Sequence, residues 1–323
     1  MTSSSPPSTL PTPEAAPPAS GVAVRTEPPG WLAWTALGIV YVIWGSTYLA
    51  IRVMVETVPP LLGAGLRFTV AGGVLVLVLA VRHGASVLWP GRRELLGALL
   101  IGVLLPGANA VVSVAEQHVP SGLTALLIAS VPLWVIVLRR LAGERVHPAT
   151  LGAVLLGFAG LALLLNPGES AGEATIGGLL TVIAAAIMWA SGSFASRRVP
   201  LPRLPLASTG WQMLLGGLVT TAAGLIAGEA GDVHFSEFSA RSIVAFAYLV
   251  VFGSWVAFTA YAWLLQNVAL SKVSTYAYVN PVVAIFLGWL ILDETVTGLT
   301  FAAAAIIVVS VALVVRSEAR PAR

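Results

Sequence analysis

The stretch SKVSTYAYVNPVVAIFLGWLILDE, residues 271–294, decides the fold. About twenty residues separate Lys272 from Asp293 without a charged side chain, which is the length that an α-helix needs to cross a hydrocarbon core. The middle of the stretch carries Tyr276, Asn280 and Pro281. Proline removes a backbone donor, and the other two bring polar atoms that lipid cannot satisfy. The stretch therefore predicts a membrane-spanning helix whose polar face lies against protein or water.

The same design occurs once more upstream, in SGLTALLIASVPLWVIVLRRLAGE, residues 121–144. Pro132 stands there at the place of Pro281 in the later stretch. Many secondary transporters build a binding site near the bilayer midplane from two such polar helices, each interrupted in the middle. The pair therefore predicts a transporter with a central site.

Composition indicates a multi-span membrane protein. Hydrophobic residues make up 57% of the chain and charged residues 10%, against about 25% charged in ordinary soluble domains. The absence of cysteine excludes disulfides, thiolate metal sites and cysteine nucleophiles. No metal or cofactor is expected. The expected partners are the lipid bilayer and a small-molecule substrate, with no nucleic acid, and both a monomer and a homodimer remain open.

Ten apolar segments predict ten transmembrane helices. Residues 1–30 are mainly Ser, Thr, Pro and Ala and bury too little apolar surface to fold, so they predict a disordered cytoplasmic tail. The helices then fall into a first group of five within residues 31–165 and a second within 176–315, and residues 316–323 form a second tail. The ten segments are 31–51, 60–81, 95–115, 120–139, 149–165, 176–195, 206–227, 242–265, 272–291 and 298–315.

Charge sets the expected orientation, because Lys and Arg near short loops stay in the cytoplasm. With the amino terminus inside, inner segments hold 14 of the 17 basic residues, and acidic residues gather outside. The pattern predicts a multi-pass protein of the cell (inner or plasma) membrane with both termini in the cytoplasm.

The chain repeats itself. At an offset of 145, Trp44 falls on Trp189, Gly65 on Gly210 and Gly72 on Gly217; at an offset of 149, Pro132 falls on Pro281. Each half has five spans, an odd number, so the second half enters the membrane from the opposite side. The predicted fold is therefore an all-α membrane protein of two inverted five-helix repeats around a central cavity.

Four stretches resemble one known family: IVYVIWGSTYLAIR, VPPLLGAGLRF, AEQHVPSGLTALLIASVPL and TYAYVNPVVAIFLG. They are similar to the EamA type of the drug/metabolite transporter superfamily, and the resemblance covers about residues 31–316. It implies ten helices in two inverted five-helix repeats, a central cavity, and export or exchange of small metabolites or drugs.

The first and sixth predicted helices supply candidate cavity residues. Tryptophan in mid-span, away from the membrane interface, brings an N–H donor that needs a partner. Small hydroxyl residues more often serve close helix packing, so that alternative stays open for them. The candidates are Trp44, Ser46, Thr47, Trp189 and Ser191.

Arg67 is the one firmly intramembrane charge, seven residues past Pro60 and so about 10 Å inward. A charge at that depth usually faces a water-filled cavity or a partner. In a cavity it would suit a carboxylate or another anionic group. The alternatives are an ion pair with Glu116 and a side chain that snorkels to the surface. Gln212 holds the equivalent position in the second half.

Polar groups beside the prolines complete the candidate cavity. Proline frees a carbonyl one turn earlier, and that carbonyl, together with Asn280, could meet substrate or a neighbouring helix. Asn109 either bridges helices or holds substrate. The candidates here are Asn109, Ser130, Tyr276 and Asn280, with Pro132 and Pro281 as helix-breaking residues.

Glu116 and His118 follow the third predicted helix, near the outer mouth. We expect a solvated loop edge there, with proton coupling as the alternative.

The predicted function is a secondary transporter and not an enzyme. It would export small metabolites, amino-acid-like compounds or drugs by alternating access. An intramembrane serine hydrolase built on Ser191 and Ser193 is one alternative, but none of the four histidines lies within a span to act as its base. A non-transporting membrane scaffold is the other alternative.

Overall fold

Every regular element in the described part of the chain is a helix. The computed structural model describes residues 29–165, 174–268, 270–273 and 275–318, so most of both predicted tails lies outside the described residues. The first elements are α1 (Gly30–Met54), α2 (Pro60–His83), η1 (Ala85–Leu88), α3 (Arg92–Leu104), α4 (Pro106–Ala115), α5 (Ser121–Ile128), α6 (Val131–Leu141) and α7 (Pro148–Leu164). The remaining ones are α8 (Ile176–Ser196), α9 (Pro205–Ile226), η2 (Glu229–Asp232), α10 (Ala240–Tyr248), η3 (Leu249–Val256), α11 (Ala257–Asn267), α12 (Leu270–Val273), α13 (Tyr276–Leu292) and α14 (Gly298–Glu318).

Seven helical segments in the described residues are long and apolar enough to cross a membrane. The prediction of an all-helical, multi-pass membrane protein is therefore confirmed. Two further apolar helices, α7 and α13, have 17 residues each, and α9 has 22 residues but is not one of the seven. The seven are Gly30–Met54, Pro60–His83, Arg92–Ala115, Ser121–Leu141, Ile176–Ala195, Ala240–Leu265 and Gly298–Ser317.

Proline explains where two of these spans break. The span Arg92–Ala115 divides at Leu105 into α3 and α4, and Pro106 is the first residue of α4. The span Ser121–Leu141 divides at Ala129 and Ser130 into α5 and α6, and Pro132 is the second residue of α6. Proline has no N–H to bond to the preceding turn and fits best at the first turn of a helix, so each new helix begins at its proline.

The expectation that Pro281 also interrupts its helix is wrong. Helix α13 runs through Pro281, and the break lies earlier, between α12 and α13. Pro281 is the sixth residue of α13, so it withdraws a single helical donor, the one expected for the carbonyl of Ala277. Helix α13 also packs along both α1 and α5, and these contacts support it on either side of the missing bond. The tail predicted to begin at residue 316 likewise begins later, because α14 extends to Glu318.

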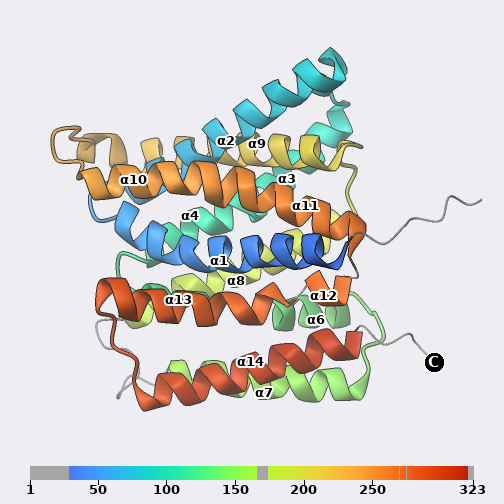
Figure 1. The fold of residues 1–323 in the computed structure, drawn as a ribbon, viewed down its shortest axis with the longest axis vertical. Helices are drawn as coiled ribbons and strands as arrows, with labels where there is room; N and C mark the ends of the chain where they lie inside the picture. The colour runs from blue at the N-terminus through green and yellow to red at the C-terminus, as the bar shows by residue number, and fades with distance from the viewer. Residues whose placement is uncertain (1–28, 166–173, 269, 274, 319–323) are drawn as a thin grey trace, which may run out of the picture.

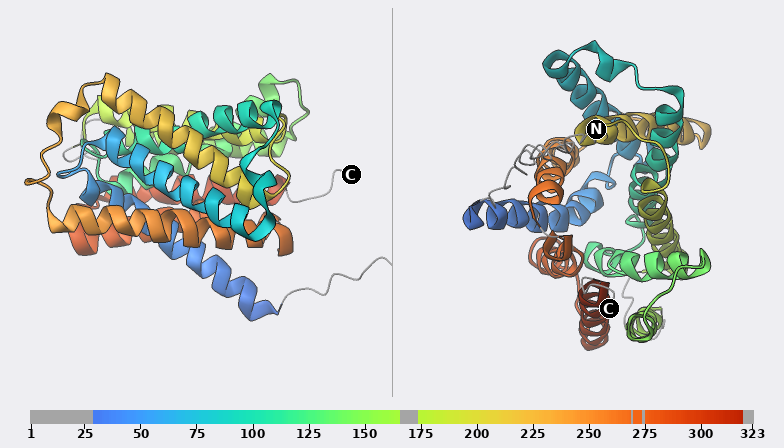
Figure 2. Two further views of the ribbon diagram at one scale, coloured as in Figure 1. Left: turned by 90° about the horizontal axis from the view of Figure 1, so that it is seen from above. Right: turned by 90° about the vertical axis from the view of Figure 1, so that its right-hand side faces the viewer.

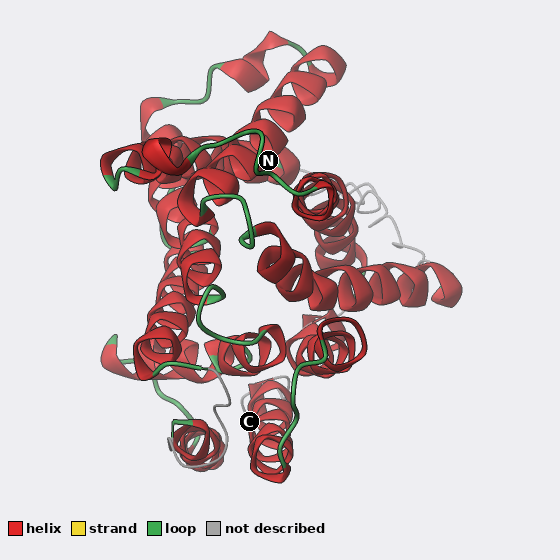
Figure 3. Ribbon diagram, turned by 90° about the vertical axis from the view of Figure 1, so that its left-hand side faces the viewer, coloured by secondary structure: helices red, strands yellow, loops and turns green. Residues whose placement is uncertain are grey.

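The bundle has two ends of opposite charge. The beginning of α1 and the end of α14 lie at the same end, on the right in Figure 1. We call this the basic end, because its helix termini and connections carry Arg82, Arg92, Arg93, Arg139, Arg140, Arg145, Arg197, Arg198, Arg203 and Arg316. The opposite end, which faces the viewer in Figure 3, is the acidic end, with Glu56, Glu229, Asp232, Glu237, Asp293 and Glu294.

Two helix pairs form the flanks of the bundle. Helix α2 packs along α9, and α7 packs along α14, as the end-on view of Figure 2 also shows. Glycine allows α2 and α9 to approach closely: a Cβ on Gly72 would lie 2.6 Å from the carbonyl oxygen of Gly210. The largest buried apolar cluster lies mainly between α5, α6, α7 and α14 and extends to Leu179 and Val182 of α8. Helices α1, α4, α8 and α13 lie between the two flanks.

Candidate substrate cavity

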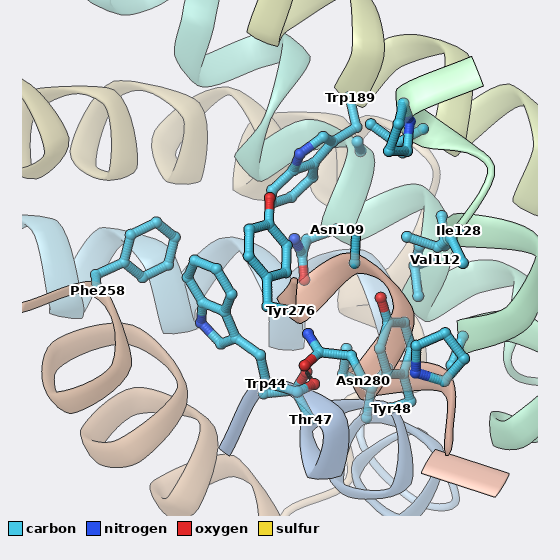
Figure 4. A pocket seen from close by; sticks show the side chains of 18 of the residues that line it. Trp44, Thr47, Tyr48, Asn109, Val112, Ile128, Trp189, Phe258, Tyr276 and Asn280 are labelled. Carbon is cyan, nitrogen blue, oxygen red and sulfur yellow. Dashed lines mark hydrogen bonds between the residues drawn. The ribbon is translucent and has the colours of Figure 1, made fainter. Parts of the chain in front are cut away.

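A cavity of about 110 Å³ lies in the middle of the bundle, between helices of both halves of the chain (Figure 4). By the same measure one water needs roughly 10–15 Å³, so the cavity has room for several waters or a small organic molecule. Nine of the residues proposed from the sequence line it: Trp44, Thr47, Arg67, Asn109, Pro132, Trp189, Tyr276, Asn280 and Pro281.

Aromatic rings form one wall of the cavity. The ring centroid of Trp44 lies 5.2 Å from that of Phe258 and 5.3 Å from that of Tyr276, both in edge-to-face contact. The Trp44 indole N–H donates to the carbonyl of Gly253 at 3.3 Å, so the expected partner of this donor is backbone. Such a wall favours an apolar or aromatic part of a ligand.

The Gly253 carbonyl, which accepts from the Trp44 indole, belongs to a π-helix. Residues Leu249–Val256 form a π-helix between α10 and α11, and the Ser254 hydroxyl donates to the carbonyl of Leu249, five residues earlier, at 3.1 Å. A π-helix widens the turn and changes which carbonyls stay within the helix ladder, and such elements are frequent at functional sites. Here the widened turn places both Gly253 and Ser254 against the cavity residues of α1 and α2.

Arg67 is buried in the cavity wall, with 4% of its surface exposed. Its Nε donates to the Ser254 hydroxyl at 3.2 Å, and its Cζ lies 4.6 Å from the ring centroid of Phe68. Within the described residues Arg67 has no carboxylate partner. Both alternatives, an ion pair with Glu116 and a side chain that snorkels to the surface, are therefore wrong. The guanidinium keeps donors for a ligand in the cavity.

Asn280, a second residue of the cavity wall, supplies an acceptor. The residue is 7% exposed, and its side-chain oxygen has no hydrogen-bond partner among the described residues. The Thr47 hydroxyl is already used, since it donates to the carbonyl of Trp44 at 2.6 Å. The cavity thus combines a cationic donor, a neutral acceptor and an aromatic wall.

Three proposed residues lie outside the cavity wall. Ser46 points toward α10, where its hydroxyl lies 2.6 Å from the Tyr248 hydroxyl. Ser130 is fully buried in the turn between α5 and α6 and donates to the carbonyl of Leu127 at 2.6 Å. Ser191 is on α8 and does not line the cavity. For Ser46 and Ser130 the local backbone or a neighbouring helix provides the partner, which is the packing alternative.

The expectation of a solvated loop edge is wrong for Glu116. Glu116 follows the span that ends at Ala115 and has 0% exposure, whereas His118 is exposed and its carbonyl accepts from the Thr175 N–H at 3.3 Å. Burial raises the pKa of the Glu116 carboxyl well above its usual range. The Glu294 charge raises this pKa further, and the Arg52 charge lowers it.

The cavity also contains residues that the sequence analysis missed, above all Val112 and Phe258. Tyr48 of the first predicted helix lines the cavity too; it is four residues past Trp44 and so shares its helix face. Phe258 gave no signal in the sequence, because a phenylalanine within an apolar span looks like any lipid-facing residue.

Within the described residues, the serine–histidine pair of the hydrolase alternative is not formed. No histidine there is hydrogen-bonded to Ser191 or Ser193, and His147 instead accepts from the Ala149 N–H at 3.2 Å. In the same residues no group of three or more His, Cys, Asp or Glu side chains is arranged to hold a metal ion.

Comparison with known proteins places the chain among transporters. Residues 31–166 and 176–316 match the EamA-like transporter family. The chain is 39% identical over 281 residues to the "Uncharacterized inner membrane transporter YedA" of Escherichia coli (strain K12), covering 86% of this chain and 89% of that protein. It is 25% identical to a "Probable amino-acid metabolite efflux pump" of the same strain, covering 83% of this chain and 90% of the relative.

A solved structure described as "Crystal structure of protein" has the same fold, with a TM-score of 0.60 at 23% identity. The match covers 88% of this chain and 96% of the other.

Proposed function

Because the chain belongs to the EamA-like transporter family, we propose that it is a secondary transporter that exports small amphipathic metabolites carrying an anionic group. Transport would proceed by alternating access, in which two halves of the bundle rock about the central cavity and expose it to one face of the membrane at a time. The halves would be two inverted repeats of five helices each, ten spans in all.

The pairing of helices supports this inverted repeat. Equivalent spans of the two halves pack on each other: α2 on α9, α7 on α14, and the span Ser121–Leu141, through α5, on α13. Other contacts occur in matched pairs. Helix α3 contacts α9, and in the other half η3 makes the corresponding contact with α2. In the same way, the contact between α4 and α8 corresponds to the contact between α11 and α1. A two-fold axis within the membrane plane would produce such matched pairs.

Individual residues support the same axis. A Cβ on Gly72 would lie 2.6 Å from the Gly210 carbonyl oxygen, and one on Gly217 would lie 2.8 Å from the Gly65 carbonyl oxygen. At the offset of 145, Gly65 is equivalent to Gly210 and Gly72 to Gly217, so these two contacts are images of each other.

The second flank pair, α7 and α14, also has two contacts that correspond to each other. A Cβ on Gly157 would meet the Ser310 hydroxyl oxygen at 2.5 Å, and one on Gly160 would meet the Cγ1 of Ile307 at 2.8 Å. At an offset of 150, these two contacts are also equivalent.

Charge supports an orientation with the basic end in the cytoplasm, where Lys and Arg near short loops are retained. Both described ends of the chain, the start of α1 and the end of α14, lie at the basic end. The termini would therefore both face the cytoplasm, and the acidic end would face outward. The protein would sit in a cell membrane, as the name of its E. coli relative says of that protein.

Buried Arg67 is the single observation that carries the proposed substrate class. A guanidinium 4% exposed, in a cavity wall and without a carboxylate partner in the described residues, is costly to maintain unless a ligand supplies the anion. A carboxylate matches its paired donors in geometry and charge. The aromatic wall and the Asn280 oxygen would then take an apolar group and an N–H group. An amino acid or a close derivative carries all three, in keeping with the name of the relative that is a probable amino-acid metabolite efflux pump.

The test compares carboxylates with their amides in vesicles containing the purified protein. We would measure exchange of a panel of labelled amino acids and of the corresponding amino-acid amides, which lack only the anionic oxygen. Losing a hydrogen bond to a charged group costs about 1.5–3 kcal/mol, so Arg67→Met should reduce carboxylate exchange by roughly 10- to 150-fold. Arg67→Lys should retain part of it.

Arg241→Met is the matched control, because Arg241 is exposed and lies outside the cavity wall. Unchanged carboxylate exchange in a well-folded Arg67→Met protein would refute the substrate class. An absence of exchange in the wild-type protein for every member of the panel would refute it too. Correct membrane insertion, checked by protein yield and elution profile, is required in each case.

A further inference from the structure

Four residues lie across the acidic end of the cavity, and we call them the closing layer: Arg52, Glu116, Ser121 and Glu294. Three of them stand four residues from a cavity-lining residue on a continuous or nearly continuous helix. Arg52 follows Tyr48, Glu116 follows Val112, and Ser121 precedes Ala125. At 1.5 Å per residue the layer is about 6 Å beyond the cavity wall.

Hydrogen bonds tie this layer together. The Glu294 carboxylate accepts from the backbone N–H groups of Ser121 at 2.7 Å and Gly122 at 3.0 Å, so it caps the amino terminus of α5. Arg52 donates to the backbone carbonyl of Glu116. The layer therefore joins α5 to the segment after α13, and α1 to the end of α4.

Glu116 is the exception, since nothing in the layer satisfies its carboxyl group. The side chain is fully buried, and neither carboxyl oxygen has a hydrogen-bond or ion-pair partner in the part of the chain that the structure describes. The hydroxyl oxygens of Ser121 and Thr124, also fully buried, lack partners within the same residues. A charged carboxylate in such a place would be very unfavourable, and a buried carboxyl group normally becomes neutral instead.

The neighbouring charges do not remove this cost. The titratable and charged groups around Glu116 are Arg52 and Tyr48 on α1 and Glu294 after α13, with His118 exposed two residues further along. Glu294 is negative and repels a second negative charge. Arg52 attracts one, but its hydrogen bond goes to the Glu116 backbone and not to the carboxylate.

We propose that Glu116 is a proton-binding site whose occupancy is linked to closure of the closing layer. In the closed layer Glu116 is a neutral carboxylic acid. When the layer opens, water reaches the group, its O–H bond breaks and the proton passes to water; closure takes one proton back from water. This inference rests on the proposed function, because the layer is a gate only in a protein that alternates access.

The link predicts how pH moves the gate. The closed state has the higher pKa, and the open state has the ordinary pKa of an exposed glutamate. Between these two values the closed state binds one more proton than the open state. The ratio of closed to open protein should therefore rise about tenfold for each pH unit of acidification in that interval.

The chain contains no cysteine, so two introduced cysteines can carry spin labels that no other residue takes up. The distance between the two labels then reports whether the closing layer is open or closed. Glu56→Cys and Thr295→Cys place the two labels at exposed positions, four residues past Arg52 and directly after Glu294. The distance between the labels would be measured in lipid nanodiscs between about pH 5 and 8. In the otherwise wild-type protein, the long-distance population should grow as pH rises.

Three variants in the labelled protein make the test specific. Glu116→Gln imitates the neutral acid and should hold the short distance at every pH. Glu116→Asp keeps a titratable group and should retain a pH response, which separates loss of the proton site from misfolding. Glu229→Gln is the matched control, because Glu229 is an acidic-end carboxylate already satisfied by the N–H groups of Leu61 at 3.1 Å and Leu62 at 2.8 Å. It should respond to pH as the wild type does.

Three results would overturn the inference: no pH response in the wild type, a pH response that persists in Glu116→Gln, or a shift driven by Na⁺ at constant pH. Substrate exchange by the wild-type protein in vesicles is measured separately. If exchange is present and the gate ignores pH, the proton site is wrong and the transport function stands.

Discussion

Two adjacent glycines of α2 allow a direct test of the contact between the two flank helices α2 and α9. A Cβ on Gly72 would lie 2.6 Å from the Gly210 carbonyl oxygen and 2.9 Å from the Leu214 Cα. Both are backbone atoms that no rotamer change can move aside. The nearest atom to a Cβ on Gly73 is the Leu214 Cδ1 at 3.8 Å, an ordinary contact.

The expected difference between Gly72→Ala and Gly73→Ala follows from these distances. Both substitutions exchange glycine for alanine at neighbouring positions inside one helix, so the gain in helix propensity, about 1 kcal/mol, cancels in the comparison. What remains is the cost of overpacking at Gly72. Unbonded atoms prefer roughly 3.5 Å or more, so α2 and α9 must separate by about 1 Å, at about 1–3 kcal/mol.

The assay is thermal unfolding of the purified variants in detergent. A cost of 1–3 kcal/mol corresponds to a melting temperature lower by roughly 2–12 °C for Gly72→Ala than for Gly73→Ala. Gly217→Ala should resemble Gly72→Ala, because a Cβ there would lie 2.8 Å from the Gly65 carbonyl oxygen, the equivalent contact. Equal melting temperatures for Gly72→Ala and Gly73→Ala would refute the close backbone contact and, with it, a main support for the inverted repeat.

Two further predictions concern the cavity and the basic end. Gly253→Ala would place a Cβ 3.0 Å from the Arg67 Nη2 and 3.2 Å from the Thr47 Cγ2. Both belong to side chains that can shift, so exchange of an anionic substrate should fall several-fold while the melting temperature changes little; unchanged exchange would contradict the placement of Arg67. Glu144 pairs with Arg139 at 2.7 Å and with Arg198, and these partners lower its pKa below the ordinary 4.5. A lowered pKa in the folded state stabilises the fold above the ordinary value and stops doing so as pH falls through the lower one. Glu144→Gln should therefore be slightly less stable than wild type at neutral pH, and the difference in melting temperature should vanish in strongly acidic buffer.

The amino-acid sequence predicts the features of this fold that depend on local composition. Long apolar segments identify the spans, and Pro106 and Pro132 mark two of the breaks. The family resemblance is confirmed by the match over residues 31–166 and 176–316. Contrary to the prediction from the sequence, Pro281 does not break its helix. A proline in the sequence indicates only a missing backbone donor, whereas the packing of α13 against α1 and α5 determines whether the helix continues.

Cavity-lining residues could be predicted from the sequence when their side chains are unfavourable in lipid, and could not be predicted when their side chains are as apolar as lipid-facing residues. Trp44, Arg67 and Asn280 are out of place in hydrocarbon, so each predicted a special environment, and each lines the cavity. Phe258 lines the same cavity, but its apolar side chain is also favourable in lipid, so nothing in the sequence indicates its position. The π-helix at Leu249–Val256 has no signal either, because its residues would suit an α-helix.

Burial of Glu116 was hidden for a different reason. Its surroundings depend on Arg52, 64 residues earlier in the chain, and on Glu294, which reaches Ser121 across 173 residues. Next to Gln117 and His118 the sequence looks like a polar loop edge. Only the packing of distant segments buries the Glu116 side chain.

The proposed inverted repeat raises the question of where such a protein would recognise its substrate. In the proposed alternating access, two halves of similar backbone would let either end of the cavity open by the same movement. A metabolite has no two-fold symmetry, and a pocket that binds it in one orientation must therefore differ between the halves. The equivalent positions divide accordingly: Trp44 matches Trp189 and Pro132 matches Pro281, whereas Arg67 stands against Gln212, Asn280 against Val131 and Glu116 against Leu265. The residues that carry the proposed recognition of an anion and of a proton are those at which the two halves have diverged. Substituting each by its counterpart, as in Arg67→Gln, removes the recognition while leaving a residue that the same backbone already accommodates.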